Sequence, residues 1–185
     1  MVRKLIYSMQ TSLDGFIAGP DGEIDWSVPD EELHRFHNEQ TRETGALLLG
    51  RRLYEVMRYW ETADQQTSAP EHELEFARIY KAMPKVVFST TLEHLEGNAR
   101  LVTDNAAEEV ARLKSEPGGD LSVGGADLAS NLMGLIDEYR LFVLPVVLGG
   151  GTPFFPDLDR RIQVELVETR TFGSRVVYLR YATKP

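Results

Sequence analysis

The sequence contains no cysteine. Without thiols the chain can form no disulfide bridge, zinc–thiolate site or cysteine nucleophile, and nothing indicates an oxidising compartment. Long apolar runs are also missing, because none approaches the roughly 18 residues that a membrane span requires. The apolar part of the N-terminal segment is too short for a signal peptide. We therefore expect a cytoplasmic protein without membrane association.

Positive charge is scarce in this sequence. Lys and Arg number 20 against 29 Asp and Glu, which gives a formal net charge of −9 at pH 7. Because no segment is rich in Lys or Arg, a nucleic-acid partner is not expected. The 185 residues, of which 42% are hydrophobic, have an ordinary globular composition and suffice for one domain spanning residues 1–185.

The stretch from Leu121 to Phe155 has the pattern of a crossover unit. A short apolar run ends in Gly124-Gly125, and apolar residues then repeat at helical spacing from Leu128 to Ile136. A second apolar run, Leu141 to Leu148, follows and ends in three glycines. This order predicts strand, turn, helix and strand, with the two strands parallel in one sheet.

The glycine pair Gly124-Gly125 is the first candidate ligand site. A turn without Cβ atoms lets the backbone approach a ligand closely, and the unpaired N–H groups at the start of the next helix carry partial positive charge. Such a turn suits a diphosphate. The alternative is that the glycines only form a tight strand–helix turn, since a lone glycine pair is not specific.

Two further predicted strands end in residues that suit phosphate. Gly50 closes the strand 45–50, and the guanidinium groups of Arg51 and Arg52 follow it. Arginine grips phosphate with a planar fork of donors, although an exposed arginine pair can also serve solubility alone. The strand 86–88 ends in three hydroxyl-bearing residues, namely Ser89, Thr90 and Thr91.

These three strand ends are expected to meet, because the carboxyl ends of parallel strands share one edge of a sheet, where ligands bind. Together they favour a dinucleotide with its diphosphate at Gly124-Gly125. A further phosphate between Arg51, Arg52 and the hydroxyls after residue 88 favours NADPH over NADH. No G-x-G-x-x-G motif follows a strand, so a Rossmann site is not predicted.

Two helix starts are predicted from capping residues. Ser27 and Asp30 indicate a helix whose inner side carries Leu33, Phe36 and Gln40. Thr103-Asp104 is expected to cap a helix that turns three apolar residues inward. These inward residues are Ala107, Val110 and Ala111.

The chain alternates strands and helices and then finishes with a hairpin. An opening strand at 5–9 leads into the glycine-rich loop 12–22. The segments 164–172 and 175–181 flank Gly173-Ser174, which is typical of a β-hairpin. The pattern therefore predicts an α/β protein with a mixed sheet and helices on both faces.

Four motifs, in order, resemble one superfamily. They read SLDGFIAGPDGEIDW, LLLGRRLYE, VVFST and VGGADLASNLMGLIDEYRLFVLPVVLGGGTPFF. Together they resemble the dihydrofolate-reductase-like superfamily, and most closely its riboflavin-biosynthesis deaminase–reductase branch, in the C-terminal reductase domain, with small stand-alone bacterial homologues. The resemblance implies an αβα sandwich around a mixed, mostly parallel sheet of about eight strands with a C-terminal antiparallel hairpin.

The resemblance also implies a cofactor, a substrate class and an assembly. The expected activity is NADPH-dependent reduction of a small pyrimidine- or pterin-like heterocycle, similar to 5-amino-6-(5-phosphoribosylamino)uracil reductase. The riboflavin-type members are commonly dimeric, so a homodimer is expected. The implied NADPH-binding residues are Gly50, Arg51, Arg52, Ser89, Thr90, Gly124, Gly125, Ala126, Asp127 and Leu128, with Gln10, Ile17 and Ala18 at the nicotinamide.

Two carboxylates are candidate proton donors under this resemblance, with water as the alternative. Asp14 of the S-L-D-G loop would lie near the reacting carbon of a ribosylaminopyrimidine, or it could stabilise its own loop. Glu32 stands near the acid that serves the pterin in dihydrofolate reductase. Trp26 and Phe36 are candidate walls of the substrate pocket.

Other readings of the sequence stay open. Dihydrofolate reductase itself is one alternative, although Leu144 stands where that enzyme has a threonine partner for its acid. A non-catalytic NADPH-binding protein and a flavin-using oxidoreductase are two more. His34 and His37 lie three residues apart on a predicted helix, which is usual for a solvated face, so no metal site is expected.

Overall fold

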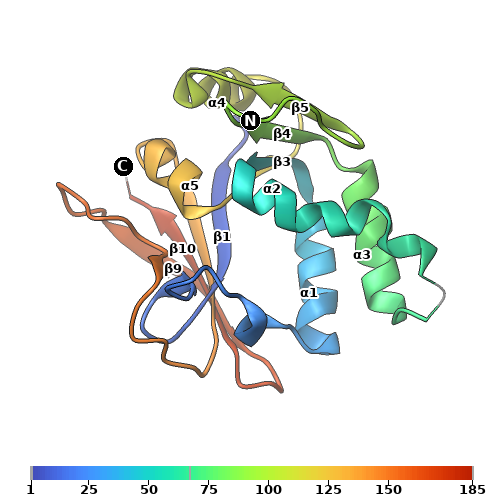
Figure 1. Cartoon of the computed structure of the whole chain (residues 1–185). Helices are drawn as coiled ribbons and strands as arrows, with labels where there is room; N and C mark the ends of the chain where they lie inside the picture. Colours follow the sequence, from blue (N-terminus) through green and yellow to red (C-terminus); the bar gives the residue numbers. More distant parts are fainter. Residues whose placement is uncertain (1, 67, 185) are drawn as a thin grey trace.

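A single sheet runs through the centre of the protein (Figure 1). The computed structural model describes residues 2–66 and 68–184. Within them the sheet has eight strands in the order β5-β4-β3-β6-β1-β7-β10-β9. These strands are β1 Leu5–Thr11, β3 Thr44–Gly50, β4 Lys85–Phe88, β5 Ala99–Val102, β6 Asp120–Gly124, β7 Glu138–Val143, β9 Val164–Thr171 and β10 Val177–Thr183.

The direction of the strands matches the prediction. The strands from β5 to β7 in this order run parallel to one another, whereas β10 is antiparallel to both β7 and β9. The predicted C-terminal hairpin is therefore confirmed as β9–β10. A second, two-stranded sheet pairs β2, Phe16–Ala18, with β8, Thr152–Pro153.

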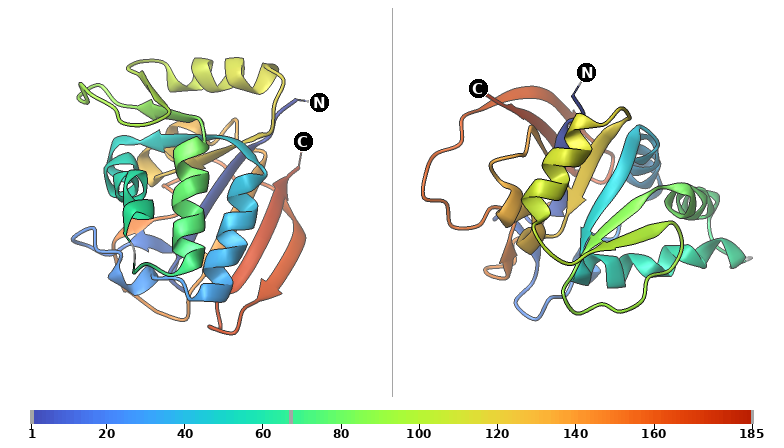
Figure 2. Two further views of the ribbon diagram at one scale, coloured as in Figure 1. Left: turned by 90° about the vertical axis from the view of Figure 1, so that its right-hand side faces the viewer. Right: turned by 90° about the horizontal axis from the view of Figure 1, so that it is seen from above.

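Helices cover both faces of the sheet, as predicted (Figure 2). Residues such as Leu5 and Tyr7 of β1 pack into one core with α4, Ala106–Ser115, and α5, Ala126–Leu132. The opposite face carries α1 Glu31–Arg42, α2 Arg51–Met57 and α3 Glu71–Ala82, and α1 lies beside α3. Short 3₁₀ turns follow at η1 Asp25–Ser27, η2 Arg58–Glu61 and η3 Ala63–Gln65.

Both predicted caps are corrected by the structure. Helix α1 is capped by Asp30, whose Oδ1 accepts from the N–H of Leu33 at 2.9 Å, while Ser27 belongs to η1. Helix α4 is capped by Asn105, which has φ 41° and ψ 58°, and not by Thr103-Asp104. An asparagine tolerates this left-handed conformation while its side chain bonds the helix start.

Other boundaries also differ from the sequence-based expectation. In α4 the buried residues are Val110 and Leu113, so Ala107 and Ala111 lie on the exposed side. Strand β7 ends at Val143 and so does not reach the predicted end at Leu148, although Leu144 still donates its N–H to the carbonyl of Thr11. The short strand β5 at the edge of the sheet was not predicted. None of the described helices is long and apolar enough to cross a membrane.

Candidate active site

The three predicted strand ends meet at one edge of the sheet. Strand β3 lies between β4 and β6, and its Leu49 is in register with Gly124 of β6. Gly50 is in register with Phe88, the last residue of β4 before Ser89. The edge predicted from the sequence therefore exists as a continuous row of three neighbouring strand ends.

The glycine pair lies where this row meets α2. A Cβ added to Gly124 would lie 2.4 Å from Cδ2 of Leu53, so a side chain there would have to displace this leucine. Gly125 has φ +96°, a conformation that other residues rarely adopt. The side chain of Leu128 is only 6% exposed and packs into the core.

Arg51 contacts the hydroxyl-bearing residues after β4. Its Nη1 donates to Oγ1 of Thr91 at 2.8 Å, and its Nε donates to Glu55 at 2.9 Å. The Oγ of Ser89 accepts from the N–H of Thr91 at 3.2 Å, which orders this turn, and Thr90 is exposed within it. A guanidinium and hydroxyls from two strand ends thus form one polar patch on the rim.

Arg52 and Asp127 connect the starts of α2 and α5. The Nη1 of Arg52 lies 3.8 Å from Oδ2 of Asp127, and both side chains are more than four-fifths exposed, at 87% and 85%. Such a pair contributes little stability. Its significance is positional, since it places Arg52 beside Ala126 and the glycine turn.

Asp14 joins the loop after β1 to the glycine turn after β7. Its carboxylate accepts from the N–H groups of Leu148 at 3.1 Å and Gly149 at 2.7 Å. Hydrogen bonding from the Ser12 side chain, together with these backbone donors, lowers the pKa of Asp14 to about 2. The carboxylate is therefore ionised at neutral pH and bonded within the loops.

The same loop carries the two residues expected at the nicotinamide. Ile17 packs against the core beneath α5, and Ala18 pairs with Thr152 of β8. A Cβ on Gly151 would lie 2.0 Å from the carbonyl oxygen of Ala18, so the two loops are in close backbone contact.

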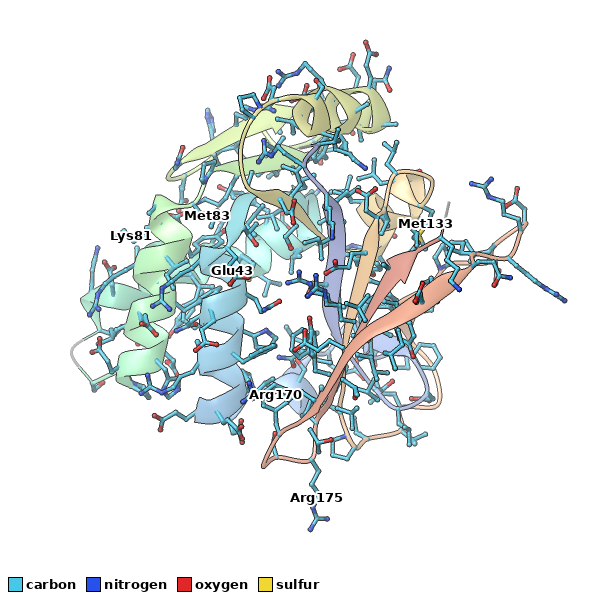
Figure 3. All side chains as sticks on the ribbon, turned by 180° about the vertical axis from the view of Figure 1, so that it is seen from behind. Glu43, Lys81, Met83, Met133, Arg170 and Arg175 are labelled. Carbon is cyan, nitrogen blue, oxygen red and sulfur yellow. The ribbon has the colours of Figure 1, made fainter. Side chains whose placement is uncertain are left out.

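Glu32 joins α1 to the turn of the C-terminal hairpin and bonds Arg170, which is labelled in Figure 3. Its carboxylate accepts from the N–H of Gly173 at 2.9 Å and from Nη2 of Arg170 at 3.1 Å. These two bonds lower the pKa of Glu32. The guanidinium of Arg170 also lies over the rings of Phe36 and Phe172, at 5.0 and 4.7 Å from their centroids.

The structure places Phe36 in the core and not on a pocket wall. It is 8% exposed and packs edge-on against the aromatic rings of Phe142, Phe172 and Tyr178. A phenylalanine on the inner side of a helix over the sheet gains more from this burial than from lining a cleft. Trp26 packs only partly against this cluster, and its Nε1 donates to the carbonyl of Glu23 at 3.2 Å.

The two histidines of α1 point to different neighbours. His34 packs against Trp60, His72 and Phe76 beside α3. His37 faces β1, where its Nε2 lies 3.2 Å from Nε2 of Gln10. Among the residues in 2–66 and 68–184, no group of three or more His, Asp or Glu side chains could hold a metal ion.

A family match covers most of the chain. Residues 3–178 match the model of the RibD C-terminal domain. The chain belongs to the RibD C-terminal domain family. Its relative YyaP of Bacillus subtilis (strain 168), an uncharacterized protein, is 36% identical over 182 residues, which cover 97% of this chain and 94% of YyaP.

Solved structures share the fold of this RibD C-terminal domain over its whole length. A protein assigned to riboflavin biosynthesis from Shewanella sp. PV-4 is 24% identical, with a TM-score of 0.76 and full coverage of both chains. Dihydrofolate reductase from Enterococcus faecalis, complexed with NADP(H), is 18% identical, with a TM-score of 0.69 and the same coverage. The dihydrofolate-reductase-like fold inferred from the sequence motifs is thus confirmed.

One hollow described in this RibD C-terminal domain lies away from the rim. It has a volume of about 500 Å³ and is lined by Ser130 and Met133 of α5 and by the loop 156–162. None of these residues was predicted to bind a cofactor. A second cavity of about 60 Å³ lies between α1 and the sheet, beside His37 and Arg140.

Proposed function

We propose that the protein is an NADPH-dependent reductase that transfers a hydride to a small pyrimidine- or pterin-like heterocycle, similar to 5-amino-6-(5-phosphoribosylamino)uracil reductase. The observation that carries this proposal is the rim formed by three neighbouring strand ends. There a Cβ on Gly124 would crowd the side chain of Leu53, and Arg51 reaches the hydroxyl of Thr91. Membership of the RibD C-terminal domain family supports the same reading.

The residues on the rim fit a phosphorylated dinucleotide. The Gly124-Gly125 turn leaves backbone exposed where a diphosphate would lie, and Arg51 with Ser89 would hold a further phosphate. The similarly folded Enterococcus faecalis enzyme was solved with NADP(H). Gln10, Ile17 and Ala18 would lie at the nicotinamide end. When bound, NADPH supplies the hydride, and the protein positions the two reactants.

Three sources are open for the proton that accompanies the hydride, namely water, Asp14 and Glu32. Asp14 and Glu32 both accept backbone N–H bonds and have lowered pKa values, so each is ionised at neutral pH. A good general acid needs a pKa near the working pH. We therefore infer that water delivers the proton and that these carboxylates hold the loops in place.

Cofactor binding and substrate oxidation test the proposal in sequence. Tryptophan fluorescence is titrated with NADPH and with NADH, and loss of the NADPH absorbance band is then followed with a panel of pyrimidines and pterins. We expect preferential binding of NADPH and oxidation that depends on one heterocycle class. Absence of NADPH binding would refute the cofactor assignment, and a yellow purified protein would point to a flavin enzyme instead.

A non-catalytic NADPH-binding protein is the second candidate. The observation in its favour is that both candidate acids are bonded within the loops. This candidate predicts tight NADPH binding, with no oxidation of NADPH in the presence of any pyrimidine or pterin of the panel. We further propose that the protein acts in the cytoplasm and forms a homodimer. Light scattering of the purified chain measures its molar mass and therefore tests the homodimer.

A further inference from the structure

The sheet face beneath α1 is polar at its centre. Strand β1 lies in the middle of the sheet, and its Ser8 and Gln10 point to the same side as Ser122 of β6 and Arg140 of β7. Central strands covered by helices are normally apolar on both faces. Polar side chains at such positions need partners, because an unpaired buried polar group is costly.

The carboxamide of Gln10 has a hydrogen-bond partner for its nitrogen but none for its oxygen among the described residues. Its Nε2 lies 3.2 Å from Nε2 of His37, at hydrogen-bond distance. Its Oε1 is shielded from solvent and has no hydrogen-bond partner among the described residues. Gln10 as a whole residue is only half-buried.

His37 is built to hold that carboxamide in one orientation. Its ring packs against Phe142, with 4.3 Å between the centroids. Burial, and to a lesser extent the charge of His34, lowers the pKa of His37 to about 4. A neutral imidazole accepts at one of its two nitrogens. Because the amide nitrogen of Gln10 can only donate, Nε2 of His37 is the acceptor in this contact and Oε1 of Gln10 takes no part in it.

The free oxygen lies next to the glycine rim. Tyr7 of β1 is in register with Val123 of β6, so Gly124 stands beside Ser8 and Gln10 is one pleat further on. Strand spacing and rise put the Cα atoms of Gln10 and Gly124 about 8 Å apart, on the same face of the sheet. A flat ring stacked against a nicotinamide at this rim would present its edge to Gln10.

We propose that Gln10 recognises a ring N–H of the substrate through Oε1, with His37 as the positioning residue that fixes its carboxamide. This inference rests on the proposed function and adds to it the residue that would recognise an unsubstituted ring N–H of the substrate. A site built to pair a polar group rejects an analogue that cannot pair with it, because the protein group is then left buried and alone.

Two probes that differ in their ring N–H groups test the assignment. The affinities of 5,6-diaminouracil and of its 1,3-dimethyl derivative are measured by calorimetry, with and without NADPH. The proteins are the wild type, Gln10→Leu, His37→Phe and His37→Gln. Gln163→Leu is the matched control, since Gln163 is exposed at the far hairpin. Circular dichroism checks that each variant folds. If Gln10→Leu does not fold, it is replaced by Gln10→Asn, whose shorter side chain cannot reach the ring N–H of the probe.

The ratio of the two affinities is the decisive quantity. In the wild type and in Gln163→Leu the N–H probe should bind about 10-fold or more tightly than the methylated one. In Gln10→Leu the ratio should fall to about 1, whatever the change in NADPH affinity. His37→Phe should lower the ratio, and His37→Gln should restore it, because glutamine offers another acceptor to the amide of Gln10.

A wild-type ratio near 1, or a ratio unchanged in Gln10→Leu, would overturn the inference, as would failure of the wild type to bind either probe. A merely structural role for Gln10 would weaken both probes equally and leave the ratio intact. Loss of NADPH binding by the wild type would instead remove the proposed function, so the two failures are separate.

Discussion

The carboxylate of Asp14 accepts a hydrogen bond from the N–H of Gly149 at 2.7 Å, although the two residues lie 135 positions apart in the chain. With the bond from Leu148, this contact closes the loop after β1 onto the turn after β7. Leu13 adds a bond from its N–H to the carbonyl of Val146 at 2.7 Å. Asp14 therefore orders the loop that carries Ile17 and Ala18.

Replacing Asp14 should loosen this loop without removing an acid. We expect Asp14→Asn to raise the KM for substrate by about 3- to 10-fold, since an amide keeps only one of the two acceptor oxygens. Steady-state kinetics between pH 5 and 9 measure KM, kcat and the pH profile, which should keep its shape. A loss of kcat by more than about 100-fold at unchanged KM would contradict this and restore Asp14 as the proton donor.

The same carboxylate has a defined effect on stability against pH. Its pKa is lowered from the ordinary value near 3.8 to about 2, so its contribution is fully present above pH 4 and is lost as the pH falls through 2. Asp14→Asn should therefore lower the melting temperature at neutral pH. The difference from the wild type should shrink in melts recorded at progressively more acidic pH.

Arg51 should discriminate NADPH from NADH. Its guanidinium lies at the rim, bonded to Thr91 and Glu55, and would hold the additional phosphate of NADPH. We expect Arg51→Ala to weaken NADPH binding by roughly 10- to 100-fold, because the charge-assisted hydrogen bonds between the guanidinium and the additional phosphate are lost. NADH lacks this phosphate, so its binding should change little. Fluorescence titration measures both affinities.

Arg35→Ala is the matched control for this variant. Arg35 pairs with Glu31 one helical turn away, in the same i,i+4 arrangement as Arg51 with Glu55, but it lies on α1. It should leave both cofactor affinities unchanged. Equal losses for NADPH and NADH in Arg51→Ala would show that Arg51 serves another part of the nucleotide.

The rim could be predicted from the sequence because its cause is simple. Parallel strands end at one edge, so Gly50, Ser89 and Gly124 had to meet once their strands were recognised. The cap of α4 could not be predicted in the same way, since the left-handed conformation of Asn105 depends on how the chain leaves β5. Strand β5 itself is four residues long at the edge, with a weak apolar pattern.

Tertiary contacts decided the roles that the sequence left open. Asp14 and Glu32 are chemically suitable acids, and only the fold shows that each accepts the N–H of a distant glycine, Gly149 or Gly173. His37 looked like half of a surface pair with His34. Its contact with Gln10 spans 27 positions, and no local spacing signals it.

The contact between the two loops can be tested with a pair of glycines. Gly149 and Gly151 both have positive φ, at +77° and +131°, but only Gly151 approaches another backbone. A Cβ on Gly151 would lie 2.0 Å from the carbonyl oxygen of Ala18, whereas a Cβ on Gly149 would meet nothing within 4 Å. Gly149→Ala should cost about 1–2 kcal/mol, the penalty for a left-handed alanine.

Gly151→Ala should cost at least about 3 kcal/mol, because β2 and β8 must also separate. Urea unfolding measures both free energies, and the substrate KM reports on the loop. We expect the KM to rise in Gly151→Ala and to stay near the wild-type value in Gly149→Ala. Equal costs for the two variants would mean that the loops part easily.

A buried ion pair behind α3 offers the sharpest test of stability. Lys85 of β4 is 1% exposed, and its Nζ donates to the carbonyls of Tyr80 at 2.7 Å and Met83 at 3.2 Å. The same Nζ lies 3.1 Å from Oε1 of Glu61, whose side chain is 8% exposed. The ammonium therefore fixes the end of α3 and the turn η2 against the edge of the sheet.

Removing one partner should be far worse than removing both charges. Lys85→Met should cost about 3–5 kcal/mol, since Glu61 would keep a buried charge without compensation. The double variant Lys85→Met with Glu61→Gln removes that charge and should recover a large part of the lost free energy of unfolding. Urea unfolding of Lys85→Met, of Glu61→Gln and of the double variant measures the three free energies. We expect the cost of the double variant to be smaller than the sum of the two single costs. If the free-energy costs of the two single variants add up to that of the double variant, the pair is not coupled. The carboxylate of Glu61 would then reach water in Lys85→Met.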